Sequence, residues 1–466
     1  MDDANRRQEA RKIPNHQPPT TNSQPPIPAP AGPRTVADAT CTYCTCMCDD
    51  IVLSVENNRI TETKNACSLG RNWFLQPRPE QAPACTIESR EASIEEGIER
   101  AAQMLTQARY PLVYGLTDTT SEAQRVAVAI ADWLGGTLDT GTSVGHAPSV
   151  LAIQSIGKAT CTLGEIRNRS DLIVFWGSNC VETHPRVFTK YTAIPEGMFV
   201  PRGRADRTCV AIDVKRTKTS DAMDLFLQIK PNADYEAIWI LRALAKGLPL
   251  DESAVLEQTG VPLAAWGDLM DRMKRARFGA IIFGMGLMRS RGEHANCEAL
   301  FQLNRELNGF TRFVTRSIRA RGNVTGGDKL VGWRTGFPYA IDLTRGYPRY
   351  NPGEYTSLDV LARREADVAL IVAADPLSSF GEAACDGLRS TPYICVGSQD
   401  TATARGAVVN FNTATYGIHT AGTVYRLDDV PIRLRPALAS RYPSEADVLS
   451  RLENRIRQLQ SVSAGE

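Results

Sequence analysis

The stretch DLIVFWGSN (residues 171–179) is an unbroken apolar run that ends in glycine, serine and asparagine. The run does not alternate between polar and apolar residues, which is typical of a strand buried on both faces of a parallel sheet. Runs of the same kind recur along the chain: PLVYGL (111–116), CVAIDV (209–214), GAIIFGMG (279–286), DVALIVAADP (367–376) and YICVGS (393–398).

Helical stretches separate these runs. The first run is followed by TSEAQRVAVAIADWLGG, in which Thr119 and Glu122 have the spacing of a capping box and Gly135 is expected to end the helix. Residues 235–247 and 294–309 are further helical stretches. The alternation predicts an α/β fold with doubly wound parallel sheets in more than one unit.

Ligands of doubly wound sheets bind at the carboxyl ends of the strands. Asp213 ends a predicted strand, and Arg216, Thr217 and Lys218 follow it directly. An acidic strand end resembles nucleoside recognition in such sheets, and the residues after it suit phosphate contacts. We therefore predict a nucleotide-binding edge at these four residues. The alternative is a tight turn at the end of a strand.

Four cysteines lie within eight positions in CTYCTCMC (41–48), and Cys67 follows in NACSLG. Between them, DIVLSVENNRITET (50–63) has the pattern of two short strands around a turn. Such a hairpin would bring Cys67 back towards the first cysteines.

Cys41, Cys44 and Cys48 are spaced C-x2-C-x3-C. Thiolates on so tight a loop can occupy three corners of a cubane cluster, with Cys67 as the fourth ligand. Zinc ribbons show paired C-x2-C knuckles, and this pattern differs from them. Cys46 leaves the ligand set open, because C-x-C offers alternative trios. We predict a [4Fe–4S] cluster, with zinc or metal-free reduced thiols as the alternatives.

The two ends of the chain differ from the middle. Residues 1–38 contain a segment with eight prolines in twenty residues (14–33), and we expect them to form a disordered or polyproline II arm. We expect a cysteine-rich subdomain at 39–80, the α/β domains at 81–440 and an amphipathic helix at 441–466. The apolar face of that helix comprises Val448, Leu449, Leu452, Ile456 and Leu459.

The composition excludes several classes of function. Hydrophobic residues make up 42% and charged residues 23%, as in ordinary globular proteins. The 53 basic and 52 acidic residues balance, so nucleic acid and anionic membranes are not expected partners. The longest apolar run (279–288) is too short to span a bilayer, and the first twelve residues lack the apolar core of a signal peptide. We expect a cytoplasmic protein with reduced cysteines.

These motifs resemble a known family. The stretch CTYCTCMCDDI with NACSLG is similar to the N-terminus of the B subunit of formylmethanofuran dehydrogenase, in the molybdopterin oxidoreductase superfamily. Four further blocks are similar to that family: ATCTLGEIRNRSDLIVFWGSNCVETHPR (159–186), IDVKRTKT (212–219), GWRTGFPYAIDLTRGYPRYNPGE (332–354) and AGTVYRLDDVPIR (421–433). The resemblance implies a molybdopterin-oxidoreductase-like fold. It also implies that the C-terminal barrel of single-chain members is missing.

The resemblance also implies where an active site would lie. The family holds tungsten or molybdenum through a Cys or selenocysteine beside a His, in a loop that corresponds to SVGHAPS (143–149). His146 matches that His, but the ligand position is Gly145, so soft thiolate ligation is unavailable there. Arg321, in IRARGNVTG, matches an Arg that orients CO2 or formate. The alternatives are a hydrogen-bonded core imidazole and a salt-bridge arginine. The edge at Asp213 would face the guanosine ends of the pterin cofactor.

Two interpretations within the family follow. We predict a non-redox B subunit of a bacterial formyltransferase/hydrolase complex in tetrahydromethanopterin-linked one-carbon metabolism, without tungsto- or molybdopterin. Its partners would be an amidohydrolase-like A subunit, a formyltransferase subunit, a C subunit and a methanofuran-type carrier. The alternative is an active tungsten- or molybdenum-containing formylmethanofuran dehydrogenase subunit that interconverts CO2 and formate or formylmethanofuran, with electrons passing through a [4Fe–4S] cluster. Outside the family, the chain would be a cluster- or zinc-stabilised structural protein.

Overall fold

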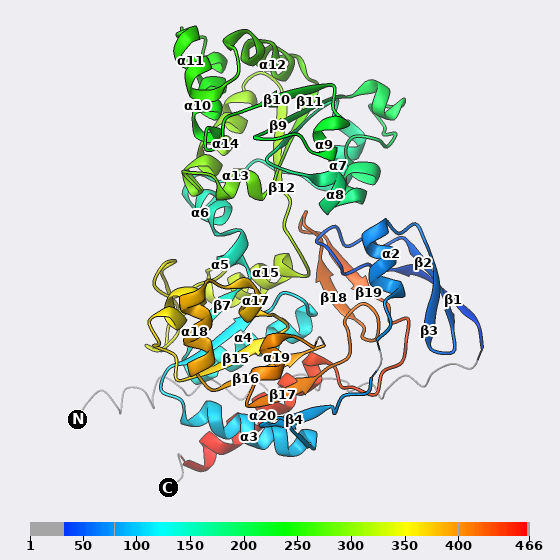
Figure 1. Ribbon diagram of the computed structural model, residues 1–466, viewed down its shortest axis with the longest axis vertical. Coiled ribbons are helices and arrows are strands. Elements are labelled where there is room, and N and C mark those ends of the chain that lie inside the picture. The colour runs from blue at the N-terminus through cyan, green and yellow to red at the C-terminus, as the bar shows by residue number, and fades with distance from the viewer. Residues whose placement is uncertain (1–31, 79, 399, 464–466) are drawn as a thin grey trace.

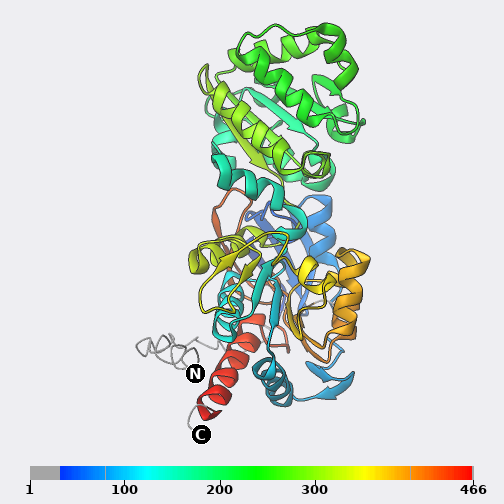
Figure 2. The ribbon, with the colours of Figure 1, turned by 90° about the vertical axis from the view of Figure 1, so that its left-hand side faces the viewer.

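The computed structural model describes residues 32–78, 80–398 and 400–463. Two α/β units lie one above the other along the long axis, and a small sheet with the cysteines lies beside their junction (Figures 1 and 2). Each α/β unit contains parallel strands, which confirms the expected fold class. Residues 1–31 of the expected proline-rich arm lie outside the described residues.

The upper, five-stranded unit contains a wholly parallel sheet in the order β10-β9-β8-β11-β12. Its strands are β8 (Leu172–Trp176), β9 (Thr208–Asp213), β10 (Leu225–Gln228), β11 (Phe278–Phe283) and β12 (Arg312–Ser317). Along β8, Val174 and Trp176 face one hydrophobic core, and Ile173 and Phe175 face the other. Since both faces are buried, the run at 171–179 needs no polar alternation.

The lower, nine-stranded unit contains five parallel strands in the order β7-β6-β15-β16-β17, flanked by antiparallel pairs. The parallel strands are β6 (Pro111–Gly115), β7 (Thr137–Thr140), β15 (Val368–Val372), β16 (Tyr393–Gly397) and β17 (Val409–Asn412). The flanking strands are β4 (Cys85–Ile87), β5 (Arg90–Ala92), β13 (Ile341–Asp342) and β14 (Arg349–Tyr350).

Helices cover both sheets. In the five-stranded unit they are α6 (Ala147–Ile156), α7 (Leu163–Arg169), α8 (Cys180–Thr183), η1 (Val187–Tyr191), η2 (Gly203–Asp206), α9 (Lys218–Asp221), α10 (Asp234–Ala245), α11 (Glu252–Thr259), α12 (Leu263–Arg275), α13 (Met285–Arg289) and α14 (His294–Leu307). In the rest of the chain they are α2 (Ser68–Leu75), α3 (Ile94–Gln107), α4 (Ser121–Leu134), α5 (Thr142–Gly145), α15 (Val324–Thr335), α16 (Ser357–Ala362), α17 (Pro376–Ser379), α18 (Glu382–Ser390), α19 (Ala402–Gly406) and α20 (Glu445–Ser463). None of the helices in the described part of the chain has the length and apolar character needed to cross a membrane.

The cap of α4 differs from the predicted one. Thr120 caps the helix, because its hydroxyl accepts from the Ala123 N–H at 3.3 Å. Glu122 does not complete a box with Thr119, since its carboxylate accepts from the backbone N–H of Thr423 at 2.9 Å. The helix ends at Gly135 with a φ of +69°, as predicted.

The five-stranded unit is inserted into the chain of the nine-stranded unit. The chain leaves the lower sheet after β7, crosses upward through residues 141–146 and returns through 318–323 to α15 (Figure 1). Within the lower sheet, β7 pairs directly with β13, which follows the return. The two crossings are therefore the covalent links between the units, and both His146 and Arg321 lie on them.

The folded N-terminal part begins earlier than the expected boundary at residue 39. Strands β1 (Arg34–Ala39), β2 (Ile51–Glu56) and β3 (Arg59–Lys64) form an antiparallel sheet, so residues 34–38 belong to a strand. The predicted hairpin at 50–63 is confirmed. The cysteines pack into the same hydrophobic core as one face of the five-stranded sheet. A second hairpin, β18 (Gly422–Tyr425) with β19 (Pro431–Leu434), lies beside them.

The C-terminal helix α20 packs on α3 and α4. Val448, Leu449, Leu452 and Ile456 are fully buried, which confirms the predicted apolar face. At the start of the helix, Glu445 is also buried and accepts a hydrogen bond from the Thr413 hydroxyl at 2.8 Å.

Glu445 should make stability depend on pH. Burial raises the pKa of its carboxyl from 4.5 to about 7, so between these values the folded chain keeps a proton that the unfolded chain releases. The free energy of unfolding should therefore fall as pH rises through this window, by about 1–3 kcal/mol. Glu445→Gln should remove this loss. The free energy of unfolding of the variant minus that of wild type should therefore be larger at pH 8 than at pH 5. Urea denaturation at several pH values measures it.

Glu453→Gln on the same helix is the control for this effect, because that carboxylate pairs with Arg457 at 2.7 Å. The difference in free energy of unfolding between Glu453→Gln and wild type should not change comparably between pH 5 and pH 8. A difference between Glu445→Gln and wild type that is the same at every pH would contradict the assignment to Glu445.

Candidate functional site

The loop over residues 41–48, called the cysteine loop below, is closed by its own backbone. The N–H of Cys41 donates to the carbonyl of Cys48 at 2.8 Å, and the N–H of Met47 donates to the carbonyl of Cys44 at 3.2 Å. Met47 has a φ of +41°, a left-handed conformation that reverses the chain just before Cys48. All four cysteines of the loop are buried.

Cys67 joins the cysteine loop from the start of α2. Its Sγ accepts from the backbone N–H of Gly70 at 3.4 Å and so caps the helix. A Cβ added at Gly70 would lie 3.1 Å from the Sγ of Cys41 and 3.8 Å from that of Cys67. Both thiols therefore converge on this glycine.

Burial and the proximity of the cysteines to one another determine the pKa values of these thiols. Burial raises the pKa of Cys41, and the nearby Cys48 and Cys44 raise it further. Burial followed by the charge of Cys48 raises the pKa of Cys44 to about 12. Within the described residues, no three metal-binding side chains have the spacing of a single ion. A cubane spreads its four thiolates more widely, because each binds a different iron. The [4Fe–4S] cluster and its alternatives, zinc and metal-free thiols, stay predictions.

Gly145 and His146 end α5 on the first crossing between the units. A Cβ added at Gly145 would meet no atom of the described chain within 4 Å. His146 is buried, and neither of its ring nitrogens has a hydrogen-bond partner among the described residues. The predicted alternative of a hydrogen-bonded core imidazole therefore finds no support here, and this orphaned ring is a candidate ligand contact.

Positive charges surround His146. Burial lowers its pKa well below the usual range, and Arg319, Lys158 and Arg289 lower it further. Burial also lowers the pKa of Lys158 to about 7. The Arg319 guanidinium lies 2.5 Å from the Asp328 carboxylate, which partly compensates its charge. Sequence reasoning missed Arg319, Lys158 and Arg289, because they come from three distant segments.

Arg321 forms the salt bridge that was the predicted alternative to a substrate contact. Its side chain is 54% exposed and forms an ion pair of 3.8 Å with Asp118. Asp118 also accepts from the Tyr416 hydroxyl at 3.4 Å. The structure brings Arg319, two residues earlier in the same motif, into the surroundings of His146. A motif with two arginines does not by itself reveal which of them faces the site.

The cysteine loop is bonded directly to this basic site. The Thr45 hydroxyl donates to the carbonyl of Arg319 at 2.8 Å and lies 3.3 Å from Nε2 of His184. Burial lowers the pKa of His184 to about 4. The cysteine loop therefore contacts the second crossing between the units at Arg319.

The side chains present do not fit a tungsten or molybdenum ion held by the protein. Gly145 offers no donor atom. The thiol of Cys161 donates to the carbonyl of Thr162 at 3.4 Å, and that of Cys180 donates to the carbonyl of His184 at 3.7 Å. Since neither thiol points to a shared ion site with His146, no step is assigned to such a metal.

The predicted nucleotide edge is a self-bonded loop after β9. The Asp213 carboxylate accepts from the backbone N–H of Val214 at 2.8 Å, and burial raises its pKa. Thr217 caps α9. Arg216 pairs with Asp221 at 3.5 Å, and Lys218 pairs with Glu182 at 2.9 Å. The four residues lie on one exposed edge of the five-stranded unit, and internal bonds account for each of them.

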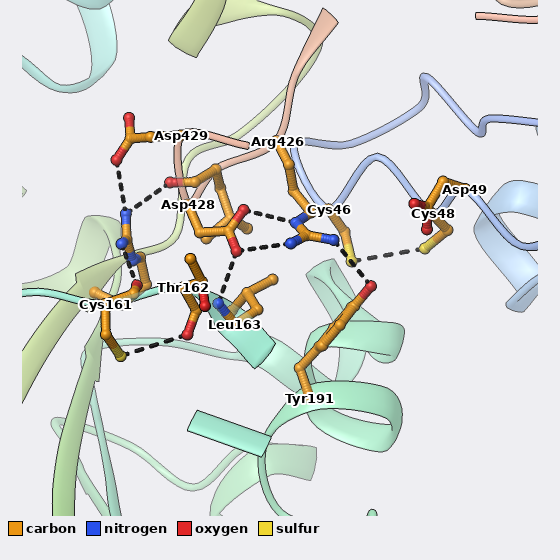
Figure 3. Close-up of polar contacts among 12 residues, drawn as sticks. Cys46, Cys48, Asp49, Cys161, Thr162, Leu163, Tyr191, Arg426, Asp428 and Asp429 are labelled. Carbon is orange, nitrogen blue, oxygen red and sulfur yellow. Dashed lines mark hydrogen bonds and ion pairs between the residues drawn. The ribbon is translucent and has the colours of Figure 1, made fainter. Parts of the chain in front are cut away.

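The turn between β18 and β19 ties the site together (Figure 3). Arg426 forms two hydrogen bonds to the Asp428 carboxylate at 2.6 and 2.9 Å. Asp428 also accepts from the backbone N–H of Leu163 in the five-stranded unit at 2.7 Å. The N–H of Leu427 donates to the carbonyl of Thr45 in the cysteine loop at 2.9 Å. This turn thus connects the cysteine loop with the five-stranded unit.

Comparison with solved structures supports the fold. The formyltransferase/hydrolase complex FhcABCD of Methylorubrum extorquens, solved with methylofuran, contains a chain that superposes with a TM-score of 0.68 at 23% identity. The match covers 81% of this chain and 100% of that one. Acetylene hydratase of Pelobacter acetylenicus superposes with a TM-score of 0.68 at 11% identity, covering 90% of this chain and 69% of that one.

Comparison with curated sequences identifies the family, although no family model matches the chain. The B subunit of tungsten-containing formylmethanofuran dehydrogenase 2 from Methanocaldococcus jannaschii is 37% identical over 412 residues, covering 87% of this chain and 94% of the relative. Its counterpart from Methanococcus maripaludis is 35% identical over 428 residues, covering 90% and 98%. The B subunit of the formyltransferase/hydrolase complex Fhc from M. extorquens is 26% identical over 297 residues, covering 63% and 75%. Because the similarity extends over nearly the whole length of the first two relatives, the chain belongs to the family of formylmethanofuran dehydrogenase B subunits.

Proposed function

We propose that this chain is a non-redox B subunit of a formyltransferase/hydrolase-type complex in the cytoplasm. The complex would serve tetrahydromethanopterin-linked one-carbon metabolism, in which formaldehyde is oxidised to formate. An amidohydrolase-like A subunit and a formyltransferase subunit would perform the chemistry, the C subunit would complete the complex, and a methanofuran-type carrier would bring the formyl group. This chain would act as the scaffold on which they assemble.

Gly145 carries this proposal. By the resemblance, it corresponds to the position where the redox-active family has its metal-ligating thiolate, and a hydrogen atom cannot bind a soft metal. Neither Cys161 nor Cys180 supplies a substitute, because their thiols donate to backbone carbonyls nearby. The match to the Fhc B subunit and to a chain of the Fhc complex supports the assignment to this kind of assembly.

We further propose that Cys41, Cys44, Cys48 and Cys67 hold a [4Fe–4S] cluster with a structural role. When bound, the cluster supplies positive charge to four thiolates, of which those of Cys41, Cys44 and Cys48 are buried. The hydrogen bond from Thr45 to Arg319 and the core shared with the five-stranded sheet connect the cluster-bound loop to the rest of the chain. In this role the cysteine loop fixes the N-terminal sheet on the α/β units.

Metal analysis of the complex, purified without oxygen, tests the proposal. We expect no stoichiometric tungsten or molybdenum, no pterin and no formate-dependent dye reduction, with the amidohydrolase-like partner co-purifying. One tungsten or molybdenum per chain would refute it.

Gly145→Cys places a thiol at the position that the proposal depends on. It should unfold at the wild-type urea concentration, because nothing lies within 4 Å of the added Cβ.

One observation favours the alternative of an active dehydrogenase. The chain is 37% and 35% identical to tungsten-containing relatives but only 26% identical to the Fhc B subunit. The alternative predicts formate-dependent dye reduction that Arg319→Ala or Arg321→Ala abolishes. Dye reduction of that kind would replace the scaffold proposal.

A further inference from the structure

The cysteine loop and Cys67 together provide five thiols, one more than a cubane cluster needs. The Sγ of Cys46 lies 3.6 Å from the Sγ of Cys48, and both side chains are buried. The expected ligand set of Cys41, Cys44, Cys48 and Cys67 leaves Cys46 without an assigned role. A fifth thiol is therefore in contact with an expected ligand.

The backbone explains how the two sulfurs meet. Residues separated by one position in an extended chain point to the same side. Here Met47, between the two cysteines, has a φ of +41°, which curls the chain and draws their side chains together. The hydrogen bond from Cys41 N–H to Cys48 C=O fixes this curl at the end of the loop. The loop therefore holds the two thiols next to each other.

Both sulfurs also have a cationic neighbour. The contact with Cys48, followed by burial, raises the pKa of Cys46, and the Arg426 guanidinium, held by Asp428 and the Tyr191 hydroxyl, offsets a smaller part of that rise (Figure 3). Arg186 and Lys190 act on Cys48 in the same way. A thiolate at either position is thus next to a positive charge, as a ligand thiolate in a buried site requires.

We propose that Cys46 is an alternative cluster ligand, which completes the set with Cys41, Cys44 and Cys67 when Cys48 is lost. The exchange involves no oxidation or reduction. The Cys46 thiol releases its proton to solvent, and the resulting thiolate binds the iron that Cys48 no longer holds. This inference rests on the proposed [4Fe–4S] cluster.

Four variants reconstituted without oxygen from iron and sulfide test the proposal: Cys46→Ala, Cys48→Ala, Cys46→Ala/Cys48→Ala and Cys41→Ala. Iron and sulfide content, visible absorbance and the electron paramagnetic resonance spectrum of the reduced protein are measured. We expect Cys46→Ala and Cys48→Ala to hold about four irons per chain like wild type, Cys48→Ala with an altered resonance spectrum. The double variant and Cys41→Ala should lose the cluster, because neither retains four thiols in the positions that the cluster needs.

The outcomes separate the two proposals. A wild type without iron would remove the proposed cluster, and this inference with it. A wild type with a cluster and a Cys48→Ala variant that loses as much iron as Cys41→Ala would overturn the inference alone. Cys48→Ser preserves the volume of the side chain, so it repeats the test should Cys48→Ala not fold. Circular dichroism of each metal-free variant verifies its fold.

Discussion

Asp428→Ala should lower the free energy of unfolding by about 3–5 kcal/mol, because it leaves the buried Arg426 guanidinium without its partner. The Asp428 side chain is completely buried and that of Arg426 is 10% exposed. The same substitution removes the acceptor of the Leu163 N–H, which joins the turn to the five-stranded unit. Urea denaturation followed by tryptophan fluorescence measures the loss.

Two controls identify the cause of that loss. Arg405→Ala breaks an ion pair with Asp400 of similar length, 2.7 Å, whose side chains are 63% and 80% exposed. It should change stability very little, since exposed pairs contribute little. The double variant Arg426→Met/Asp428→Ala removes both charges and should recover part of the loss. A double variant as unstable as Asp428→Ala would show that the unpaired guanidinium is not the cause.

Cys44→Ala should produce the second large effect. If the proposed cluster is bound, its loss removes several kcal/mol, because the free energy of binding a structural metal group is part of the free energy of folding. The metal-free wild type should lose a similar amount. Anaerobic thermal melting with and without an iron chelator, together with iron–sulfur absorbance, measures both.

Cys395→Ala is the matched control for this experiment. Cys395 is a buried cysteine of β16, far along the chain from the cysteine loop. Its substitution removes a similar thiol from a packed core and should cost about 1 kcal/mol, with or without chelator. Equal melting of the two variants, and no iron–sulfur absorbance in wild type, would indicate bare thiols at the cysteine loop.

The parallel strands could be predicted because their physical cause is local. Strand β8 is apolar throughout, since Ile173 and Phe175 enter one core and Val174 and Trp176 the other. The short strands at the sheet edges could not be predicted in the same way. Strand β4 has three residues, and it exists because β17 offers it an edge.

Features that depend on contacts between distant segments could not be predicted from the sequence. RTVADA follows the proline-rich segment and has few apolar residues, so its place in a strand depends on pairing with β2. Glu122 has the spacing of a capping residue but bonds to Thr423, 301 positions away. The spacing of residues within one helix cannot predict a partner so far away in the sequence.

The candidate site shows the same division. The resemblance identified the adjacent Gly145 and His146, because they lie in one short motif. The charges that act on His146 come from Arg319, Lys158 and Arg289, which only the folded chain brings together. Arg319 was not predicted, because the motif has no information on which of its arginines is buried.

The pairing of β7 with β13 has a consequence for how such a chain could have been assembled. These strands are neighbours in the lower sheet, although the whole five-stranded unit lies between them in the sequence. The pairing of β7 with β13 in the lower sheet therefore does not require that these strands be neighbours in the sequence. In genetic terms, the upper unit corresponds to a cassette between two coding segments of the lower unit, and His146 and Arg321 lie at its two seams.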